Sequence, residues 1–289
     1  MASTIRGADT LIQQEDWESA LQEQLDEPTK WKEFANVVFT NFQTINNPYH
    51  TDPSVSTYQP GTPYTFAAMV QTNESISLTN HRIIAQPIDR ADLAFLNYAD
   101  AMTYARRQAV ILDETIEQFI YDDHPEWTDF TNVTIGGAAG SITVSATNVD
   151  DICRAMLREI REASGQSLIE RNGVFMVWQP ANFEFLEAFM QANGFMTADS
   201  YLRNAGGTVY GLRYMGIDHY TSNLLRAGRM VGGIKKAIHL YVLNATYGKV
   251  QINDQDPNLQ SGVSVVTRVD FEATVWNNLA PVVFDIAVS

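Results

Sequence analysis

One long amphipathic segment, residues 89–121, most constrains how this chain can fold. Small or apolar residues recur along it in steps of three and four: Phe95, Ala99, Met102, Ala105, Ala109, Leu112, Ile116 and Phe119. That spacing places them on one face of an α-helix, and Pro87 and Pro125 bracket the segment. We therefore predict a single helix of roughly 50 Å, about three times the usual length in globular domains. Its acidic residues are expected on the opposite, solvent-facing side: Asp113, Glu114 and Glu117.

Composition limits what the chain can do. Its 289 residues, 45% hydrophobic and 18% charged, indicate a folded protein with one elaborate domain or two. With 19 basic and 34 acidic residues, the net charge of −15 disfavours general attraction to nucleic acid or anionic membranes. Cys153 is the single cysteine, so no intrachain disulfide is expected, and we interpret it as a buried helix residue. No positively charged and apolar leader pattern opens the chain, so no signal peptide is predicted, and no apolar run reaches about 18 residues, so no transmembrane helix is predicted.

The region before the long helix is polar and extended. Residues 11–38 are predicted to form a helical arm, broken at Pro28, that lies on a surface instead of entering a core. Residues 64–71 alternate as a strand does, the segment 72–74 is predicted to turn, and residues 76–82 return. A two-stranded hairpin this polar is not stable alone in water. We therefore expect it to lie on another part of the chain or on a neighbouring molecule.

The region after the long helix mixes helices and strands. We predict the following elements in order: a short hairpin at 132–146, a helix at 148–163, a buried strand at 173–179, a helix at 180–192, a strand at 209–220, a basic glycine-rich loop at 226–233, an apolar element of unassigned type at 235–243, a long strand at 263–275 and a final run at 281–288. The long strand alternates apolar and polar residues, which predicts one buried and one solvated face. Together these elements indicate an α+β fold.

No motif in the sequence reaches the standard of an active site. The run from Gly136 to Ser141 lacks the lysine of a phosphate-binding loop. Asp254 opens a pattern that imitates a calcium loop but lacks its glycine and its glutamate. The five histidines have no metal-ligand spacing, and His219 is interpreted as structural. We expect no enzyme activity, cofactor or metal.

The order of these elements resembles the HK97-type major capsid protein of tailed bacteriophages. The resemblance extends over nearly the whole chain and is carried by four stretches: SISLTNHRIIAQPIDRADLAF leading into ARRQAVILDETIEQFI, TNVDDICRAMLREIREASGQSLIERNGVFMVWQPANFEFL, YGLRYMGIDHYTSNLL, and GGIKKAIHLYV followed by GVSVVTRVDFEATVWNNLAPVVFDI. The first looks like the end of that family's E-loop and its spine helix. Each motif is loose, and their common order carries the resemblance.

The resemblance implies a division of the chain into four regions. Residues 1–50 would be the N-terminal arm, residues 51–88 the E-loop, residues 89–147 with 251–289 the P-domain, and residues 148–250 the A-domain. The E-loop of this family lies across a neighbouring subunit, which accounts for a hairpin that cannot stand alone. The residues expected at subunit interfaces are Asn73, Glu74, Arg82, Arg226 and Arg229.

The resemblance also implies function and partners. The chain would be a non-enzymatic major capsid protein, assembled in the host cytoplasm, whose hexamers and pentamers form the icosahedral shell around a double-stranded DNA genome. Its N-terminal segment is too short for a fused scaffolding domain, so a separate scaffolding protein is expected, along with a portal, decoration proteins and weak non-specific contact with DNA, but no membrane. No lysine lies between Lys32 and Lys235, so no E-loop lysine is available for an isopeptide cross-link. Two alternatives remain, an encapsulin-type compartment of the same fold and an enzyme of unrecognised type.

Overall fold

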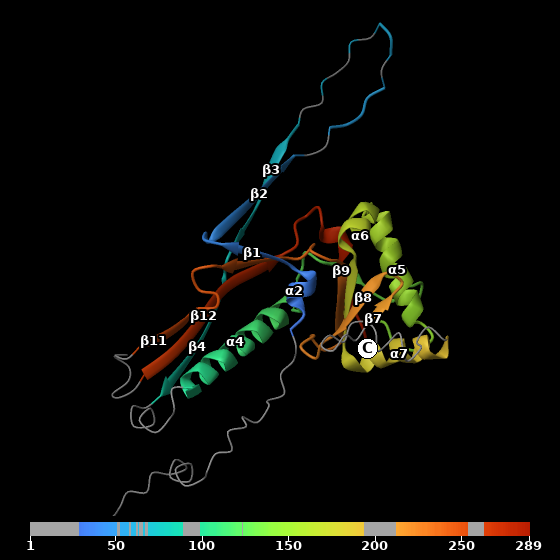
Figure 1. The fold of residues 1–289 in the computed structure, drawn as a ribbon. Helices are drawn as coiled ribbons and strands as arrows, with labels where there is room; N and C mark the ends of the chain where they lie inside the picture. The colour runs from blue at the N-terminus through green and yellow to red at the C-terminus, as the bar shows by residue number, and fades with distance from the viewer. Residues whose placement is uncertain are drawn as a thin grey trace, which may run out of the picture.

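The computed structural model describes residues 29–50, 53–57, 59–61, 63, 66, 69–88, 99–122, 124–193, 212–253 and 263–289. The predicted arm at 11–28, the start of the long helix with Phe95, and the calcium-like turn at 254–258 lie outside these residues. The described chain contains a five-stranded sheet, a six-stranded sheet and a separate two-stranded ribbon. Figure 1 shows the ribbon projecting away from both sheets.

The five-stranded sheet is built around its longest strand, β12 (Val263–Thr274). Its neighbours on one side are β10 (His239–Leu243) and β11 (Val250–Asn253), and on the other side β4 (Asn80–Ile88). Beyond β10 lies the parallel strand β1 (Asn36–Thr40). The sequence predicted the bounds of β12 to within one residue, but the predicted solvated face is wrong in part, because Ser264 and Asp270 on that face are buried. It also assigned residues 36–38 to a helix, and that assignment is wrong.

The long helix, α4 (Ala99–Ile120), packs against β12. Leu112, Ile116 and Ile120 are buried, as the helical spacing predicted for the first two. Ala109, which was placed on the same stripe, is exposed. The buried residue one position earlier is Gln108, whose amide accepts a hydrogen bond from Thr267 Oγ1 at 2.6 Å.

Glu117 corrects the predicted solvent face of α4. It is fully buried, and its carboxylate accepts hydrogen bonds from the backbone N–H of Lys30 at 2.6 Å and from the Tyr121 hydroxyl at 2.7 Å. A carboxylate tolerates burial when such donors replace its water. The prediction failed because neither donor belongs to the helical pattern of α4: Lys30 precedes α2, and Tyr121 directly follows α4.

The six-stranded sheet forms a compact lobe with three helices. Its strand order is β5 (Thr128–Phe130), β13 (Val283–Ala287), β9 (Arg229–Ile234), β6 (Val174–Trp178), β8 (Ile217–Thr221) and β7 (Leu212–Tyr214). The helices are α5 (Val149–Glu162), α6 (Gln166–Asn172) and α7 (Pro180–Ala192), and the 3-10 turn η1 covers Ala280–Val282. The sequence predicted α5, β6 and α7 within a residue or two.

Three predictions in this lobe are wrong. The segment 226–233 is mostly the buried strand β9, where Gly232 and Gly233 lie so close to neighbouring elements that a side chain would not fit. The segment 132–146 forms successive turns instead of a hairpin, with Ile142 bridged to Val288. The helical spacing of Ile152, Ala155, Met156, Ile160 and Ala163 predicts that all five face inward, but Ala163 is exposed.

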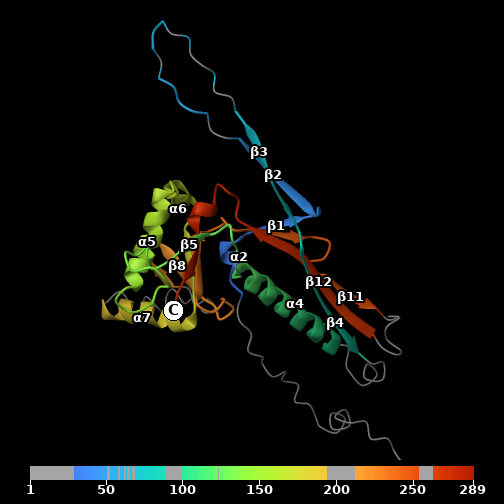
Figure 2. The same cartoon turned by 180° about the vertical axis from the view of Figure 1, so that it is seen from behind.

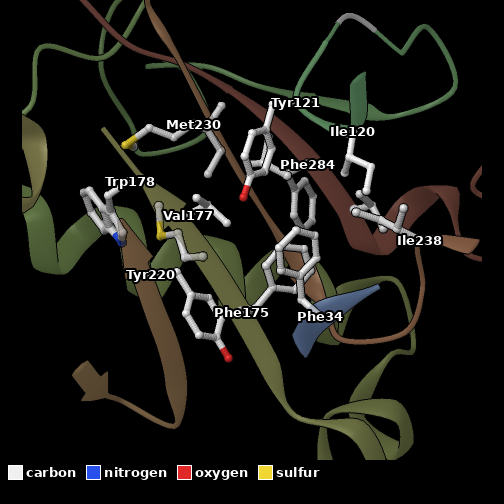
Figure 3. Packing of buried hydrophobic residues seen from close by; sticks show 14 of the residues in the cluster. Phe34, Ile120, Tyr121, Phe175, Val177, Trp178, Tyr220, Met230, Ile238 and Phe284 are labelled. Carbon is white, nitrogen blue, oxygen red and sulfur yellow. The ribbon is translucent and has the colours of Figure 1, made fainter. Parts of the chain in front are cut away.

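A short helix, α2 (Trp31–Phe34), packs between the lobe and α4. Trp31 and Phe34 are fully buried, and the Phe34 ring stacks on Phe175 of β6 with centroids 4.5 Å apart (Figure 3). Phe34 also lies near Tyr121, which directly follows α4. The segment predicted to lie on a surface therefore enters the main core here, because its aromatic residues can bury a large apolar area.

Candidate subunit interface

The ribbon pairs β2 (Thr44–His50) with β3 (Gln71–Ser77) in antiparallel register. Thr44 lies opposite Ser77, and His50 lies opposite Gln71. The turn predicted at 72–74 is wrong, because these residues form the middle of β3. Described residues from 53 to 70 that follow β2 have no strand assignment, and they form the distal part of the hairpin (Figure 2).

The ribbon region carries few charges. Between residues 35 and 81 the only Asp, Glu, Lys or Arg side chains are Asp52 and Glu74, whereas these four residue types make up 18% of the whole chain. Several of its described apolar side chains are exposed: Phe39, Phe42, Val55, Phe66, Met69 and Val70. Depletion of charge together with exposed aromatic and methionine side chains is typical of surfaces that other proteins cover. In a chain of charge −15, such a surface also avoids repulsion between copies.

The root of the ribbon is held to the five-stranded sheet by apolar and polar contacts. Leu78, which follows β3, is buried in a small cluster with Tyr241 and Trp276. Glu272 of β12 accepts hydrogen bonds from the Thr79 backbone N–H at 3.2 Å and from Asn80 Nδ2 at 3.0 Å, and also from the Thr79 hydroxyl. Sequence analysis missed this set, because Glu272 and Asn80 are 192 residues apart.

The five residues expected at interfaces fall in three places. Asn73 and Glu74 lie together on β3, where Asn73 Nδ2 donates to Asn46 Oδ1 at 3.3 Å and Glu74 accepts from the Asn277 N–H at 3.3 Å. Arg82 is exposed on β4. The structure thus places Asn73 and Glu74 together on the ribbon and Arg82, Arg226 and Arg229 in other parts of the fold.

Arg226 and Arg229 meet in the lobe on one carboxylate. Both approach Asp285 Oδ2, at 3.5 and 3.3 Å. Asp285 is buried, whereas each arginine side chain stays about one-third exposed, at 33% and 30%. Two guanidinium groups therefore approach one carboxylate in the middle of β13.

Strand β4 offers a second surface. It pairs with β12 along its whole length, and no other described strand pairs with it. Most of its residues are exposed, including Ile83 at 62%. Unpaired backbone groups along an edge strand can bind another extended chain.

Three ionisable groups of the lobe have pKa values displaced by burial and by their contacts. Burial raises the pKa of the Cys153 thiol to about 12, and burial lowers the pKa of His219 to about 4. Burial lowers the pKa of Lys235, but its contacts with Asp218 at 2.6 Å and Tyr220 at 2.9 Å outweigh this, so the pKa is raised and the amine stays protonated. A protonated amine and a protonated thiol are poor nucleophiles.

Neither a metal cluster nor a membrane helix is found in the described parts of the chain. No group of three or more His, Cys, Asp or Glu residues among them could hold a metal ion. None of the helices there has both the length and the apolar character needed to cross a membrane.

Solved structures show where the fold occurs. No protein-family model matches the sequence, and no curated protein sequence matches it. A structure from Mycobacterium phage Che8 is similar with a TM-score of 0.70 and 16% identity, covering 94% of this chain and 96% of that chain. The capsid of Ralstonia phage GP4 is similar with a TM-score of 0.66 and 8% identity, covering 100% of this chain and 99% of that chain. The mature capsid of bacteriophage PhiM1 is similar with a TM-score of 0.62 and 11% identity, covering 95% of this chain and 91% of that chain.

These similarities define the fold class. The chain has the α+β fold of HK97-like capsid structures, and the match extends over nearly its whole length. The resemblance found in the sequence is therefore confirmed at the level of the fold.

Proposed function

We propose that this chain is a major capsid protein that assembles into the head shell of a tailed phage. One observation carries the proposal: capsid structures are covered almost from end to end, up to 99% of the Ralstonia phage GP4 chain. A fold alone does not define a function. The ribbon adds support, because it extends beyond the body of the protomer and carries a charge-poor, partly apolar surface.

The regions implied by the resemblance are proposed here with their original bounds. The projecting ribbon supports residues 51–88 as the E-loop, although β2 lies within the proposed arm at 1–50. Helix α4 and strand β12 support the P-domain at 89–147 and 251–289. The lobe with α5, α6 and α7 supports the A-domain at 148–250, although β5 and β13 of its sheet lie outside these bounds and β10 pairs with β12.

The proposed partners are further copies of the chain in hexamers and pentamers. Asn73, Glu74, Arg82, Arg226 and Arg229 are proposed as contact residues, because each lies on the ribbon, on an edge strand or at the exposed arginine pair. A separate scaffolding protein, a portal and decoration proteins complete the proposed set, with weak non-specific contact to packaged DNA. The net charge of −15 agrees with weak DNA contact.

Electron microscopy and light scattering of the purified chain test the proposal, with and without a co-expressed scaffolding protein. Capsomers or closed shells are expected. A compact monomer at every concentration and under both conditions would contradict it. Shells isolated from their natural source that enclose an enzyme instead of DNA would favour the encapsulin-type alternative.

A ribbon variant tests whether the hairpin makes the contacts between copies. Residues 51–70 are replaced by Asn-Gly, which suits a two-residue turn between His50 and Gln71 because these residues already pair. The protomer should keep its thermal stability, because the five-stranded and six-stranded sheets are untouched, whereas shells should no longer form. Normal shells from this variant would exclude the distal hairpin as an assembly contact.

A further inference from the structure

The direction of the ribbon is set at its root. Only two short connections join the ribbon to the sheets: residues 41–43 between β1 and β2, and residues 78–79 between β3 and β4. The strands of the ribbon pair only with each other among the described strands. A small rotation at the root therefore moves the distal end through a large arc.

The apolar contacts at the root attach the ribbon without fixing its angle. Leu78 is 2% exposed in its cluster with Tyr241 and Trp276, and Ile45 and Ile76 from the two ribbon strands pack against it. Apolar burial is non-directional, so such a cluster resists separation more than rotation.

Two carboxylates supply the directional contacts. Glu272 Oε2 accepts three hydrogen bonds, from the Thr79 N–H, the Thr79 hydroxyl and Asn80 Nδ2. Glu74 Oε2, three residues before the end of β3, accepts the N–H of Asn277, which follows β12. Hydrogen bonds depend strongly on angle, and those to an ionised group are the stronger kind.

These contacts attach two points of the chain, at residue 74 and at residues 79–80, to β12 and the segment that follows it. Glu272 on β12 accepts hydrogen bonds from Thr79 and Asn80, which follow the ribbon. Glu74 on the ribbon accepts a hydrogen bond from Asn277, which follows β12. Two such points, separated along the chain, define a direction, which one point cannot do. The two glutamates and their donors Thr79, Asn80 and Asn277 are called the root clamp below.

We propose that the root clamp sets the direction in which the ribbon leaves the protomer, so that Glu272 and Glu74 are positioning residues for contact with the next copy. The proposal rests on the proposed shell function. Loss of the clamp leaves the protomer folded but spreads the ribbon over many directions. Copies then meet at variable angles, and the shells become irregular.

The test measures ribbon direction in the unassembled full-length chain. Spin labels are placed at exposed positions by Ser75→Cys on β3 and Gln118→Cys on α4, in a Cys153→Ala background. The double variant Glu74→Ala/Glu272→Ala should raise the share of other label distances roughly tenfold, as the loss of hydrogen bonds to a carboxylate implies. Glu272→Gln keeps an acceptor oxygen, so its share of other label distances should lie between that of the labelled parent chain and that of the double variant.

A matched control and a second measurement separate the possible outcomes. Glu114→Ala on α4 removes a carboxylate away from the root and should leave the distances unchanged. Unchanged distances in the double variant overturn the clamp, whether or not the native chain forms shells. Broadened distances with normal shells overturn its role in assembly. Failure of the native chain to assemble overturns the proposed function, and the distances still decide whether the clamp exists.

Discussion

Replacing Glu117 by alanine tests how the N-terminal part of the fold is held. The Glu117 carboxylate is fully buried on α4 and accepts hydrogen bonds from the Lys30 N–H and the Tyr121 hydroxyl. Lys30 immediately precedes α2, whose Trp31 and Phe34 lie in the core. The carboxylate therefore anchors the point at which α2 enters between α4 and the lobe.

The expected loss in the free energy of unfolding follows from the two donors that lose the Glu117 carboxylate as their acceptor. Each donor buried without a partner costs about 1–3 kcal/mol, so two of them cost about 2–6 kcal/mol. The cavity left by the shorter side chain adds to this loss. A typical free energy of unfolding is about 5–15 kcal/mol, so Glu117→Ala should remove a large part of it. Glu117→Gln keeps one acceptor oxygen and should lose less.

Urea unfolding followed by tryptophan fluorescence measures the change, and hydrogen exchange at the Lys30 amide localises it. Glu114→Ala on the same helix is the control and should change the free energy of unfolding by no more than about 0.5 kcal/mol. Equal free energies for the two alanine variants would refute the anchoring role. So would an unchanged exchange rate at Lys30 in Glu117→Ala.

Three further predictions concern pH, close packing and covalent chemistry. Burial lowers the pKa of His219 from 6.5 to about 4, so the unfolded chain binds more protons between these values; the free energy of unfolding should fall by roughly 3 kcal/mol from pH 6.5 to 4, and His219→Gln should flatten this slope. In Gly233→Ala the added Cβ would lie 2.5 Å from the Val282 carbonyl oxygen, so the free energy of unfolding measured in urea should fall by about 2–4 kcal/mol. In Gly248→Ala the added Cβ meets no atom within 4 Å, so the free energy of unfolding should fall by only about 1 kcal/mol. Mature particles boiled in detergent with reductant should run as one band near 32.3 kDa, and a ladder would reveal a cross-link.

Local periodicity was enough for the elements whose pattern is decided by one buried face. Helices α5 and α7 and strand β12 were predicted in this way, because their apolar residues repeat at the period of the element. Strand β6 was predicted from a continuous apolar run, and all five of its residues are buried. The same reasoning failed for β9, where glycines indicated a loop. Gly232 and Gly233 are needed because Met156 and the segment at Val282 approach their Cα atoms.

The candidate interface depends on contacts that local patterns do not encode. Strand β3 alternates only weakly and was split by a predicted turn, because its partner β2 lies across a long loop. Glu272 looked like one more polar residue on the solvated face of β12 until Thr79 and Asn80 were placed beside it. The predicted interface residues at 73, 74, 82, 226 and 229 stay predictions, since a single protomer does not show what covers them.

The central position of β12 has a consequence for synthesis of the chain. Strand β4 pairs with β12 along its length, and Asn80 and Glu272 are 192 residues apart. At about 5–20 residues per second, β4 leaves the ribosome roughly 10–40 s before its partner. During that interval the sheet that carries the ribbon root has no central strand, and both edges of β4 are open.

The delay has two consequences for the nascent chain. Open strand edges can aggregate, so a chaperone that shields residues 80–88 should raise the yield of folded protomer. Glu272 and Trp276, which contact the ribbon root, are made after both strands of the ribbon and after β4. The ribbon root therefore cannot reach its native packing until β12 and Trp276 have left the ribosome.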